Sequence, residues 1–316
     1  MRVLVTGGAG FIGSHTLRKL TELGHETALL DEFNDFYDPA IKRANAAASG
    51  AKIYEGDIRR PEDVENALKD FRPEAVIHLA ARAGVRPSLE EPQLYIDTNI
   101  TGTLNILEGM KRHGIKRLVF GSSSSVYGCN TKVPFAEDDP ISRTISPYAA
   151  TKVAGEHLCS VFSHLYGLDI VALRFFTVYG PGQRPDLAIH KFSRLIWERK
   201  TIDQFGDGST RRDYTFVDDI VDGVTKALVH PVQGYDVFNL GESRTVELRE
   251  LIGLLESTLG RKALIRLKPE QPGDVPITYA DISKARRLLG YAPVVPIEEG
   301  IGRFVAWFKS IVAPSQ

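Results

Sequence analysis

A glycine-rich turn near the start of the chain limits the fold more than any other feature of the sequence. Residues 7–13 read GGAGFIG and stand between an apolar run, Val3 to Val5, and a helical pattern from Ile12 to Leu23. A second apolar run, Thr27 to Leu30, follows. Strand, glycine-rich turn, helix and strand within about thirty residues form a βαβ unit, the context that a dinucleotide-binding fingerprint requires.

The glycines of this turn have separate expected roles. Gly7 permits a tight turn, Gly10 lets the backbone approach a diphosphate, and Gly13 lets the helix pack closely on the strand. The phosphates would lie at the helix N-terminus, where free N–H groups and the helix dipole favour anions. The spacing is G-x-x-G-x-x-G, not the simplest G-x-G-x-x-G. The predicted cofactor contacts in this turn are Gly7, Gly10, Phe11, Ile12 and Gly13.

An acidic residue stands at the end of the second strand. A carboxylate at Asp31 can bind the ribose 2′-hydroxyl and repels a 2′-phosphate, so the sequence favours NAD over NADP. Asp31 also opens a polar loop, Glu32 to Asp38, and a capping role in that loop is compatible with ribose binding. We expect Asn34 of this loop to contact the cofactor as well.

Three more apolar segments end in residues suited to contact a cofactor. They are 52–54, 74–81 and 117–120, and each ends in or leads to small or polar residues. The carboxyl ends of parallel strands meet at one edge of an open α/β sheet, where ligands bind. Asp57 is suited to contact the adenine amine, whereas His78 is expected to be structural. The predicted contacts at this edge are Asp57, Ile58, Leu79, Ala80 and Ala81.

A tyrosine and a lysine four residues apart form a candidate proton-transfer pair. Tyr148 and Lys152 lie in a predicted helix, so their side chains share one helix face. An ammonium beside a phenol favours the phenolate and so lowers a tyrosine pKa that is ordinarily about 10. Ser122 to Ser125 follow an apolar strand and should lie beside the cofactor. A hydroxyl there can bridge the substrate proton to the Tyr148 base.

The overall composition argues against several classes of protein. The 316 residues carry a formal net charge of −1 without a basic or acidic block, so we expect neither a nucleic-acid partner nor a membrane partner. No apolar run approaches the length of a transmembrane helix, and no signal-peptide pattern is expected at the N-terminus. Cys129 and Cys159 lack metal-ligand spacing, which predicts a reduced, cytoplasmic protein without a metal.

The sequence pattern changes after Val178. Proline, glycine and charged residues interrupt the alternation, and short elements follow, among them helices at 187–197, 217–229 and 246–259 and a strand at 235–240. Such interleaved elements predict a smaller domain set against the sheet. The expected fold class is α/β, with a doubly wound parallel (Rossmann) sheet and a smaller C-terminal α/β substrate-binding domain. The expected boundaries are 1–177 for the NAD-binding domain, with a return at about 213–240, and 178–212 with 241–316 for the substrate domain.

With these motifs together, the chain resembles the extended short-chain dehydrogenase/reductase family. More narrowly, it is similar to the NAD-dependent nucleotide-sugar 4-epimerases. The resemblance covers nearly the whole chain and continues through RFFTVYGP at 174–181, GDGSTRRDY at 206–214, DD at 218–219 and QPGD at 271–274.

The resemblance implies roles for the candidate catalytic residues. Tyr148 would be the base, Lys152 would lower its pKa and hold the nicotinamide ribose, and Ser123 would be the bridging hydroxyl. Asn99 would support the cofactor side of the site. The cofactor implied is NAD.

Two related classes of enzyme lack their acid groups in this chain. Nucleotide-sugar dehydratases of this fold place an Asp-Glu pair just before Val-Tyr-Gly, where this chain has Ser124 and Ser125. The decarboxylases that form UDP-xylose typically carry a Glu at the position of Ser125. The resemblance therefore favours an epimerase.

Among the epimerases, the galactose type has Asn at the position of Thr177 and usually Lys at the position of Ala83. The glucuronate type is more similar to this chain, which has FNDFYDP at 33–39, AGVR at 83–86 and RPDLAI at 184–189. The resemblance thus implies reversible C4 epimerisation of UDP-glucuronate to UDP-galacturonate through a 4-keto intermediate with bound NAD.

Short hydroxyl side chains suit a uronate substrate for a chemical reason. Oxidation at C4 places the C6 carboxylate β to a ketone, and such acids lose CO₂ when the carboxylate stands perpendicular to the carbonyl plane. Ser124, Ser125 and Thr177 can hold the carboxylate away from that geometry without strong charge pairing. They can equally serve as backbone caps, as serine and threonine often do at strand ends.

The UDP part of the substrate calls for cations and a shaped slot. Arg212 matches the family's diphosphate-binding arginine, and Arg184 is a second candidate, because a guanidinium fits phosphate geometry. Lys191 is suited to flank the uracil, and Asp274 matches a residue that binds the uridine ribose. The predicted substrate contacts are Ser124, Ser125, Thr177, Arg86, Arg184, Lys191, Arg212 and Asp274.

The sequence leaves three alternative functions open. The nearest alternative is a UDP-glucose/UDP-galactose 4-epimerase. A non-catalytic dinucleotide-binding protein would not need Ser123, Tyr148 and Lys152. Net reduction of a 4-keto sugar would favour NADPH, which the acidic residue after the second strand disfavours.

The family usually forms homodimers through two helices per subunit, and the helices before Gly114 and after Pro147 are suited to this.

Overall fold

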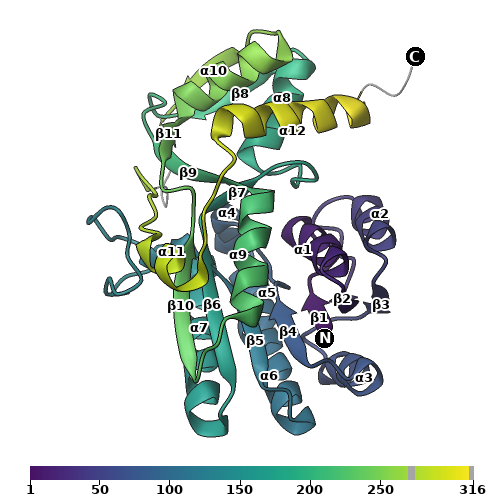
Figure 1. The fold of residues 1–316 in the computed structure, drawn as a ribbon. Helices are drawn as coiled ribbons and strands as arrows, with labels where there is room; N and C mark the ends of the chain where they lie inside the picture. The colour runs from purple at the N-terminus through teal and green to yellow at the C-terminus, as the bar shows by residue number, and fades with distance from the viewer. Residues whose placement is uncertain (270–274, 313–316) are drawn as a thin grey trace.

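The fold is built around a seven-stranded parallel sheet with helices on both faces (Figure 1). The computed structural model describes residues 1–269 and 275–312. The strand order is β10-β6-β5-β4-β1-β2-β3, which confirms the predicted doubly wound sheet. The strands are β1 (Arg2–Thr6), β2 (Glu26–Asp31), β3 (Lys52–Glu55), β4 (Ala75–His78), β5 (Arg117–Ser123), β6 (Asp169–Phe175) and β10 (Tyr235–Leu240).

Successive residues of each strand pack into two different cores. Val3 and Val5 belong to the core on one face of the sheet, whereas Leu4 belongs to the core on the other. A strand covered on both faces requires this period of two with apolar residues on each side. One face carries α1 (Phe11–Glu22), α2 (Pro39–Ser49) and α9 (Val217–Val229), and the other carries α3 (Pro61–Phe71), α6 (Gly102–His113) and α7 (Pro147–Tyr166).

The helix that carries Tyr148 and Lys152 begins and ends at well-defined signals. The Ser146 hydroxyl accepts a hydrogen bond from the Ala149 backbone N–H at 3.1 Å, and Pro147 occupies the first helical position. At the other end, Gly167 adopts the left-handed conformation that closes α7. These caps fix where the helix starts, and so fix which face Tyr148 presents to the sheet.

After β6 the chain enters a second region, drawn at the top of Figure 1, that adjoins the carboxyl edge of the large sheet. It contains a three-stranded sheet of order β11-β9-β7 and a two-stranded sheet of β12 and β8. The predicted helix at 246–259 begins later than expected, at Leu248. Val246 belongs instead to strand β11, where it pairs with Arg212 of β9. The elements are β7 (Thr177–Tyr179), β8 (Thr201–Phe205), β9 (Arg211–Phe216), β11 (Thr245–Glu247), β12 (Leu264–Lys268), α8 (Ala188–Trp197), α10 (Leu248–Leu259), α11 (Ser283–Leu289) and α12 (Ile297–Val312).

The chain returns to the large sheet once before its end. From β9 it runs directly into α9, which packs against α1, and β10 then pairs in parallel with β6 from Tyr235 opposite Ile170 to Leu240 opposite Phe175. The seventh strand is therefore made only after the first part of the second region, β7 to β9, has been crossed. Within the described residues, no helix is long and apolar enough to cross a bilayer.

Candidate active site

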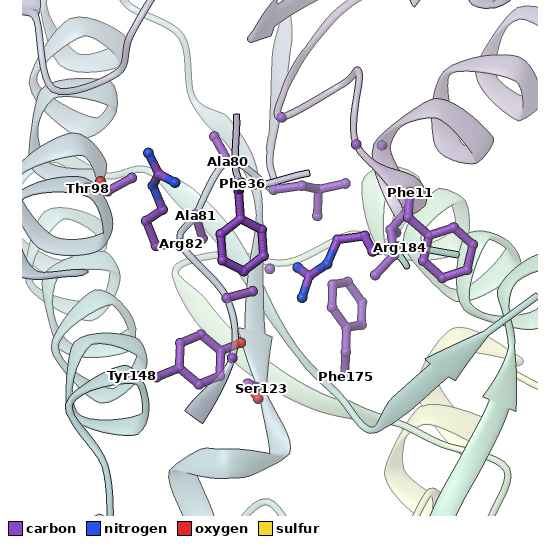
Figure 2. A pocket seen from close by; sticks show the side chains of 18 of the residues that line it. Phe11, Phe36, Ala80, Ala81, Arg82, Thr98, Ser123, Tyr148, Phe175 and Arg184 are labelled. Atoms are coloured by element: carbon purple, nitrogen blue, oxygen red, sulfur yellow. The ribbon is translucent and has the colours of Figure 1, made fainter. Parts of the chain in front are cut away.

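A cavity of about 490 Å³ lies at the carboxyl edge of the large sheet and extends to β7 and the loop that follows it. Figure 2 shows Tyr148 and Ser123 on one side of this cavity and Arg184 on another, with Phe36 between them. The position agrees with the rule that open α/β sheets bind ligands where the strand order reverses. The predicted residues that line it are Gly7, Gly10, Phe11, Ile12, Gly13, Asp31, Asn34, Asp57, Ile58, Leu79, Ala80, Ala81, Ser123, Ser124, Ser125, Tyr148, Lys152, Thr177 and Arg184.

Four predicted contacts do not line this cavity. Asn99 is buried behind the cavity wall, and the Arg86 guanidinium lies 5.0 Å from the ring centroid of Phe205. Lys191 is exposed on α8, and Arg212 donates to the Arg211 carbonyl oxygen at 2.9 Å. Asp274 lies outside the described residues.

The glycine-rich turn leaves no room for side chains at two positions. Gly7 has a φ of +70°, and a Cβ there would stand 2.7 Å from the Ala80 backbone nitrogen. A Cβ on Gly13 would overlap the Gly7 carbonyl oxygen. The turn is thus packed against β4 while the start of α1 opens into the cavity, which fits a diphosphate at the helix N-terminus.

Asp31 is held by the backbone and still has capacity to bind a ribose. Its carboxylate accepts from the Ala9 N–H at 3.1 Å and the Phe33 N–H at 3.0 Å, so the capping role expected from the sequence is present. A carboxylate can accept about four hydrogen bonds, which leaves two for ribose hydroxyls. Burial raises the pKa of Asp31, and the two N–H donors and nearby Lys42 oppose that shift.

A buried lysine fixes the loop beside Asp31. The Lys42 ammonium donates to the Asn34 carbonyl oxygen at 2.8 Å and to its side-chain oxygen at 2.6 Å. It also lies 4.6 Å from the ring centroid of Tyr37. Burial lowers the pKa of Lys42, although the Asp31 and Glu32 carboxylates act against this. The lysine therefore orders the loop that borders the expected adenosine site.

Asp57 lines the cavity but already has a strong partner. The Arg59 Nε donates to one of its oxygens at 2.7 Å, and the Arg59 backbone N–H donates to the other at 2.8 Å. Burial acts to raise the pKa of Asp57, but these bonds outweigh it and hold the pKa below its ordinary value. Asp57 is thus an ionised acceptor at the adenine end of the cavity.

Two buried polar atoms on one wall of the cavity have no hydrogen-bond partner among the residues that the structure describes. They are Nε of Arg82 and the Thr98 hydroxyl, and Figure 2 shows both side chains on the same side. The Asn99 amide accepts from the Arg82 N–H at 2.8 Å and donates to its carbonyl oxygen at 2.9 Å, and so fastens this wall. A polar ligand such as a dinucleotide would satisfy both atoms.

The sequence indicated Asn99 but neither Arg82 nor Thr98, because the geometry of this wall depends on a π-helical turn. Residues Asp97–Thr101 form that turn, η1, after the short helices α4 (Val85–Glu90) and α5 (Pro92–Ile96). Such turns often occur at functional sites, but no residue pattern in the sequence predicts one. Backbone geometry consequently brings Thr98 to the cavity wall and Asn99 behind it.

Tyr148, Ser123 and Lys152 form the reactive corner of the cavity. Burial raises the pKa of Tyr148, whereas a hydrogen bond from Ser123 and the charge of Arg184 lower it. Lys152 donates from Nζ to the Gly121 carbonyl oxygen at 2.7 Å. Burial lowers the pKa of Lys152 to about 8, so most of it is charged at neutral pH. A phenol, a hydroxyl and a buried cation are thus assembled as proton transfer requires.

A second group of polar side chains faces the reactive corner. Ser124 and Ser125 begin the 3₁₀ turn η2 (Ser124–Tyr127), and the Ser125 N–H donates to the Ser123 hydroxyl at 3.2 Å. Arg184 forms a two-point ion pair with Asp186 at 3.0 and 2.9 Å and lies 5.1 Å from the ring centroid of Phe36. A substrate anion would here meet hydroxyls and one partly neutralised guanidinium.

His78 is structural, as the sequence suggested. Its two ring nitrogens pair with the hydroxyls of Thr6 at 2.6 Å and Thr103 at 3.0 Å. Complete burial lowers the pKa of His78 to about 3, and the charge of Lys152 adds to this effect. A neutral histidine with both nitrogens paired has no free proton to exchange with a substrate.

Comparison with known proteins places this arrangement in a family. Residues 3–241 match the sequence model of the NAD dependent epimerase/dehydratase family. A UDP-glucuronate 4-epimerase of Thermodesulfobacterium geofontis is 45% identical over 97% of this chain and 95% of its own length.

Solved structures agree with the sequence match. A UDP-glucuronic acid 4-epimerase from Bacillus cereus, determined with UDP-glucuronic acid and NAD, is 36% identical with a TM-score of 0.91 and covers 98% of this chain and 100% of its own. A UDP-glucose 4-epimerase from Thermotoga maritima, determined with UDP-glucose, is also 36% identical with a TM-score of 0.92, over 99% and 100% of the two chains.

Proposed function

This chain belongs to the NAD-dependent epimerase/dehydratase family, and from that premise we propose that it interconverts UDP-glucuronate and UDP-galacturonate by epimerisation at C4. The observation that carries the proposal is one cavity that joins Tyr148, Ser123 and Lys152 to the hydroxyls of Ser124 and Thr177. The first three residues serve proton transfer at C4. The last two would face the C6 group of the sugar. Neither is an acid that could expel a C6 hydroxyl or promote loss of a C6 carboxylate.

The residues of the chain divide the proton chemistry among them. Tyr148 takes the proton of the sugar 4-hydroxyl and later returns it, and the Ser123 hydroxyl, its hydrogen-bond partner, steadies the phenolate. The Arg184 guanidinium offsets part of the cost of forming a phenolate in a buried site. The Lys152 cation, one helical turn along α7, is proposed to add to this stabilisation. Bound NAD⁺ would supply the acceptor for the hydride that leaves C4 and the donor that returns it.

The chain fits NAD at several independent points. The start of α1 would receive the diphosphate, and Asp31 has free acceptor capacity for the adenosine ribose. Arg82 and Thr98 have polar atoms without a partner in the described part of the chain. Lys152 stands at the opposite end of the cavity, where the nicotinamide ribose would lie. These residues would retain the cofactor through a full catalytic cycle.

The carboxylate of the substrate needs restraint as well as binding. When C4 is oxidised, the C6 carboxylate is β to a ketone and loses CO₂ if it turns perpendicular to the carbonyl plane. Ser124, Ser125 and Thr177 provide neutral donors, and the charge of Arg184 is shared with Asp186. We propose that these residues hold the carboxylate near the carbonyl plane while leaving the ring free to turn over.

We also propose that the UDP part extends past the cavity into the second region, 178–212 and 241–316. Leu187 lines the cavity, and Lys191 lies one turn further along the same helical segment. Arg212 on β9 and Asp274 are the proposed contacts for the diphosphate and the uridine ribose, with Arg86 on the sheet side. Arg212→Gln should then raise the KM for every UDP-sugar by a similar factor, and an unchanged KM would remove it from the site.

One incubation tests the proposed activity. The purified protein is given UDP-glucuronate without added NAD, and UDP-galacturonate and CO₂ are both quantified. Formation of UDP-galacturonate without CO₂ is the expected result. Release of CO₂ as the main product would instead identify a decarboxylase, and neither product would refute the proposal.

Epimerisation of UDP-glucose is the second candidate, because a structure solved with UDP-glucose is as similar to this chain as one solved with UDP-glucuronic acid. The two candidates differ in what faces C6. Hydroxyls at Ser124, Ser125 and Thr177 suit a carboxylate, so kcat/KM should be clearly higher for UDP-glucuronate than for UDP-glucose. Equal values for the two sugars would favour the second candidate.

We further infer a homodimer that works in the cytoplasm. α6 and α7 pack against one another and expose Leu104, Val161 and Leu165, whose burial would favour pairing of two subunits. Both cysteines are unpaired, as is usual in a reducing compartment. Val161→Glu with Leu165→Glu should convert a dimer to a monomer in light scattering, and a monomeric wild type would refute the assembly.

A further inference from the structure

A buried ion pair lies beneath the reactive corner and takes no part in the proton transfer itself. Nε and Nη2 of Arg174, on β6, donate to Oε1 and Oε2 of Glu156, on α7, at 2.9 and 2.8 Å. The two side chains are only 4% and 7% exposed. Apolar residues in place of such a pair are often as stable or more stable, whereas loss of one partner leaves a buried unpaired charge. Stability alone therefore explains this pair poorly.

The pair fastens α7 to the strand that carries the catalytic serine. The Ser122 hydroxyl donates to Glu156 Oε1 at 2.6 Å. One helical turn earlier, Lys152 Nζ donates to the Gly121 carbonyl oxygen at 2.7 Å. The helix is thus attached to the carboxyl end of β5 at two successive turns, and Tyr148 lies on the next turn. These two attachments set how far the phenol stands from the end of β5.

On its other side, the pair continues into the polar network at the end of β10. Arg174 Nη1 donates to the Tyr127 hydroxyl at 3.0 Å, and that hydroxyl donates to the Asn239 side-chain oxygen at 2.6 Å. The Asn239 amide then donates to the carbonyl oxygens of Phe135 and Asp281 at 2.9 and 3.1 Å. One unbroken chain of hydrogen bonds therefore runs from β5 to the segment that leads into α11.

We propose that Glu156 and Arg174 form a positioning pair that fixes the separation of the Tyr148 and Ser123 hydroxyls and so sets the rate of proton transfer. The inference rests on the proposed epimerase function. Neither Glu156 nor Arg174 lines the cavity, so the pair acts through the residues that do. A displacement of about 1 Å in such a constellation can lower a rate by about 10²-fold. The expected loss is therefore in kcat, with little change in the affinity for the UDP-sugar.

The pair also sets the electrostatic surroundings of Lys152. The titratable groups around its ammonium are Glu156 and Cys159 on α7 and His78 on β4. Burial raises the pKa of the Cys159 thiol and lowers that of His78, so both are neutral near pH 7. The Glu156 carboxylate is then the charged neighbour among them, and it favours the ammonium. Loss of Glu156 should move the alkaline limb of the kcat profile to lower pH.

The test uses a variant that removes both charges and keeps a similar volume, Glu156→Leu with Arg174→Met. It is compared as the NAD-containing enzyme with the wild type, on whichever of UDP-glucuronate and UDP-glucose the wild type turns over. We expect an unfolding temperature close to wild type, full NAD content, a kcat lower by about tenfold or more, and a KM within about twofold. A matched control, Arg244→Gln with Glu298→Gln, removes a two-point surface pair and should leave kcat unchanged.

The outcomes separate this inference from the proposed function. A stable double variant with wild-type kcat and an unchanged alkaline limb would overturn the positioning role while leaving the epimerase intact. A wild type that turns over neither sugar would overturn the proposed function and the inference with it. If the double variant does not fold, Arg174→Lys keeps the charge but not the two-point geometry. This variant should lower kcat and leave KM unchanged. A wild-type kcat in Arg174→Lys would equally overturn the positioning role.

Discussion

Lys152 donates from its ammonium to the carbonyl oxygen of Gly121 at 2.7 Å, which anchors the catalytic helix to the strand that ends in Ser123. The contact fixes the cation deep inside the protein, where an ammonium loses most of its hydration. Burial consequently lowers the pKa of Lys152 to about 8. The lysine therefore changes its charge within a range that an activity assay can reach.

The first prediction concerns this titration. The ammonium is the form present below its pKa, and it is lost as pH rises through about 8. If the cation stabilises the Tyr148 phenolate as proposed, kcat should fall above about pH 8. A kcat profile between about pH 6 and 10 measures this limb. In Lys152→Arg, whose charge persists in this range, residual activity should show no such limb, and an unaltered limb would assign the titration to another group.

Removal of the proposed base should separate chemistry from cofactor binding. Tyr148→Phe deletes one hydroxyl and should lower kcat by at least about 10²-fold while NAD remains bound. The neighbouring Tyr95 offers a matched control, because its ring lies 6.2 Å from that of Tyr148 and its hydroxyl donates to the Ala83 carbonyl oxygen at 2.9 Å. Tyr95→Phe should retain most of its activity. Comparable losses in both variants would mean that Tyr148 acts through packing.

Substitution of one hydroxyl should discriminate between sugars. Thr177→Val keeps the shape of the side chain and removes a donor worth about 1 kcal/mol. The kcat/KM for UDP-glucuronate should fall by about fivefold or more, whereas the value for UDP-glucose should stay nearly constant. Each substrate serves as the control for the other in the same preparation. Equal losses for both would place Thr177 away from the C6 carboxylate.

Loss of the strand-end acid should weaken cofactor retention. Asp31→Ala removes hydrogen bonds from a charged acceptor, each worth about 1.5 to 3 kcal/mol, so NAD affinity should drop by about tenfold to a hundredfold. The variant should lose NAD on gel filtration and regain activity when NAD is added. Asp70→Ala, at an exposed carboxylate paired with Lys52, is the control and should keep its NAD. Full NAD content in Asp31→Ala would contradict the proposed ribose contact.

Much of the fold followed from local patterns because the first half of the chain is built from short-range units. The turn at Gly7 to Gly13 needs only a strand before it and a helix after it, and both are fixed by neighbouring residues. Boundaries were less certain where a long-range pairing decides them. Val246 continued a helical pattern in the sequence, yet its pairing with Arg212 makes it part of a strand.

Site residues could be predicted where they stand at strand ends or at helical spacing. Residues that tertiary geometry brings to the cavity could not be predicted in this way. Tyr148, Ser123 and Asp31 line the cavity because each stands at or beside the carboxyl end of a strand. Thr98 reaches it from a π-helical turn that no residue pattern in the sequence predicts, and Asn99 of the same turn holds the backbone of Arg82 in place. The reach of long side chains is also set by tertiary packing, and Arg86 accordingly lies against the Phe205 ring outside the cavity.

The late pairing of β10 with β6 has a consequence for synthesis of the chain. Until Leu240 has left the ribosome, β6 is an open edge whose buried apolar residues, Ile170 to Leu173, have no neighbour on one side. Such an edge is a template for association with other chains. Fragments that end before Tyr235 should therefore aggregate, and a nascent chain would depend on chaperones until its last large-sheet strand docks.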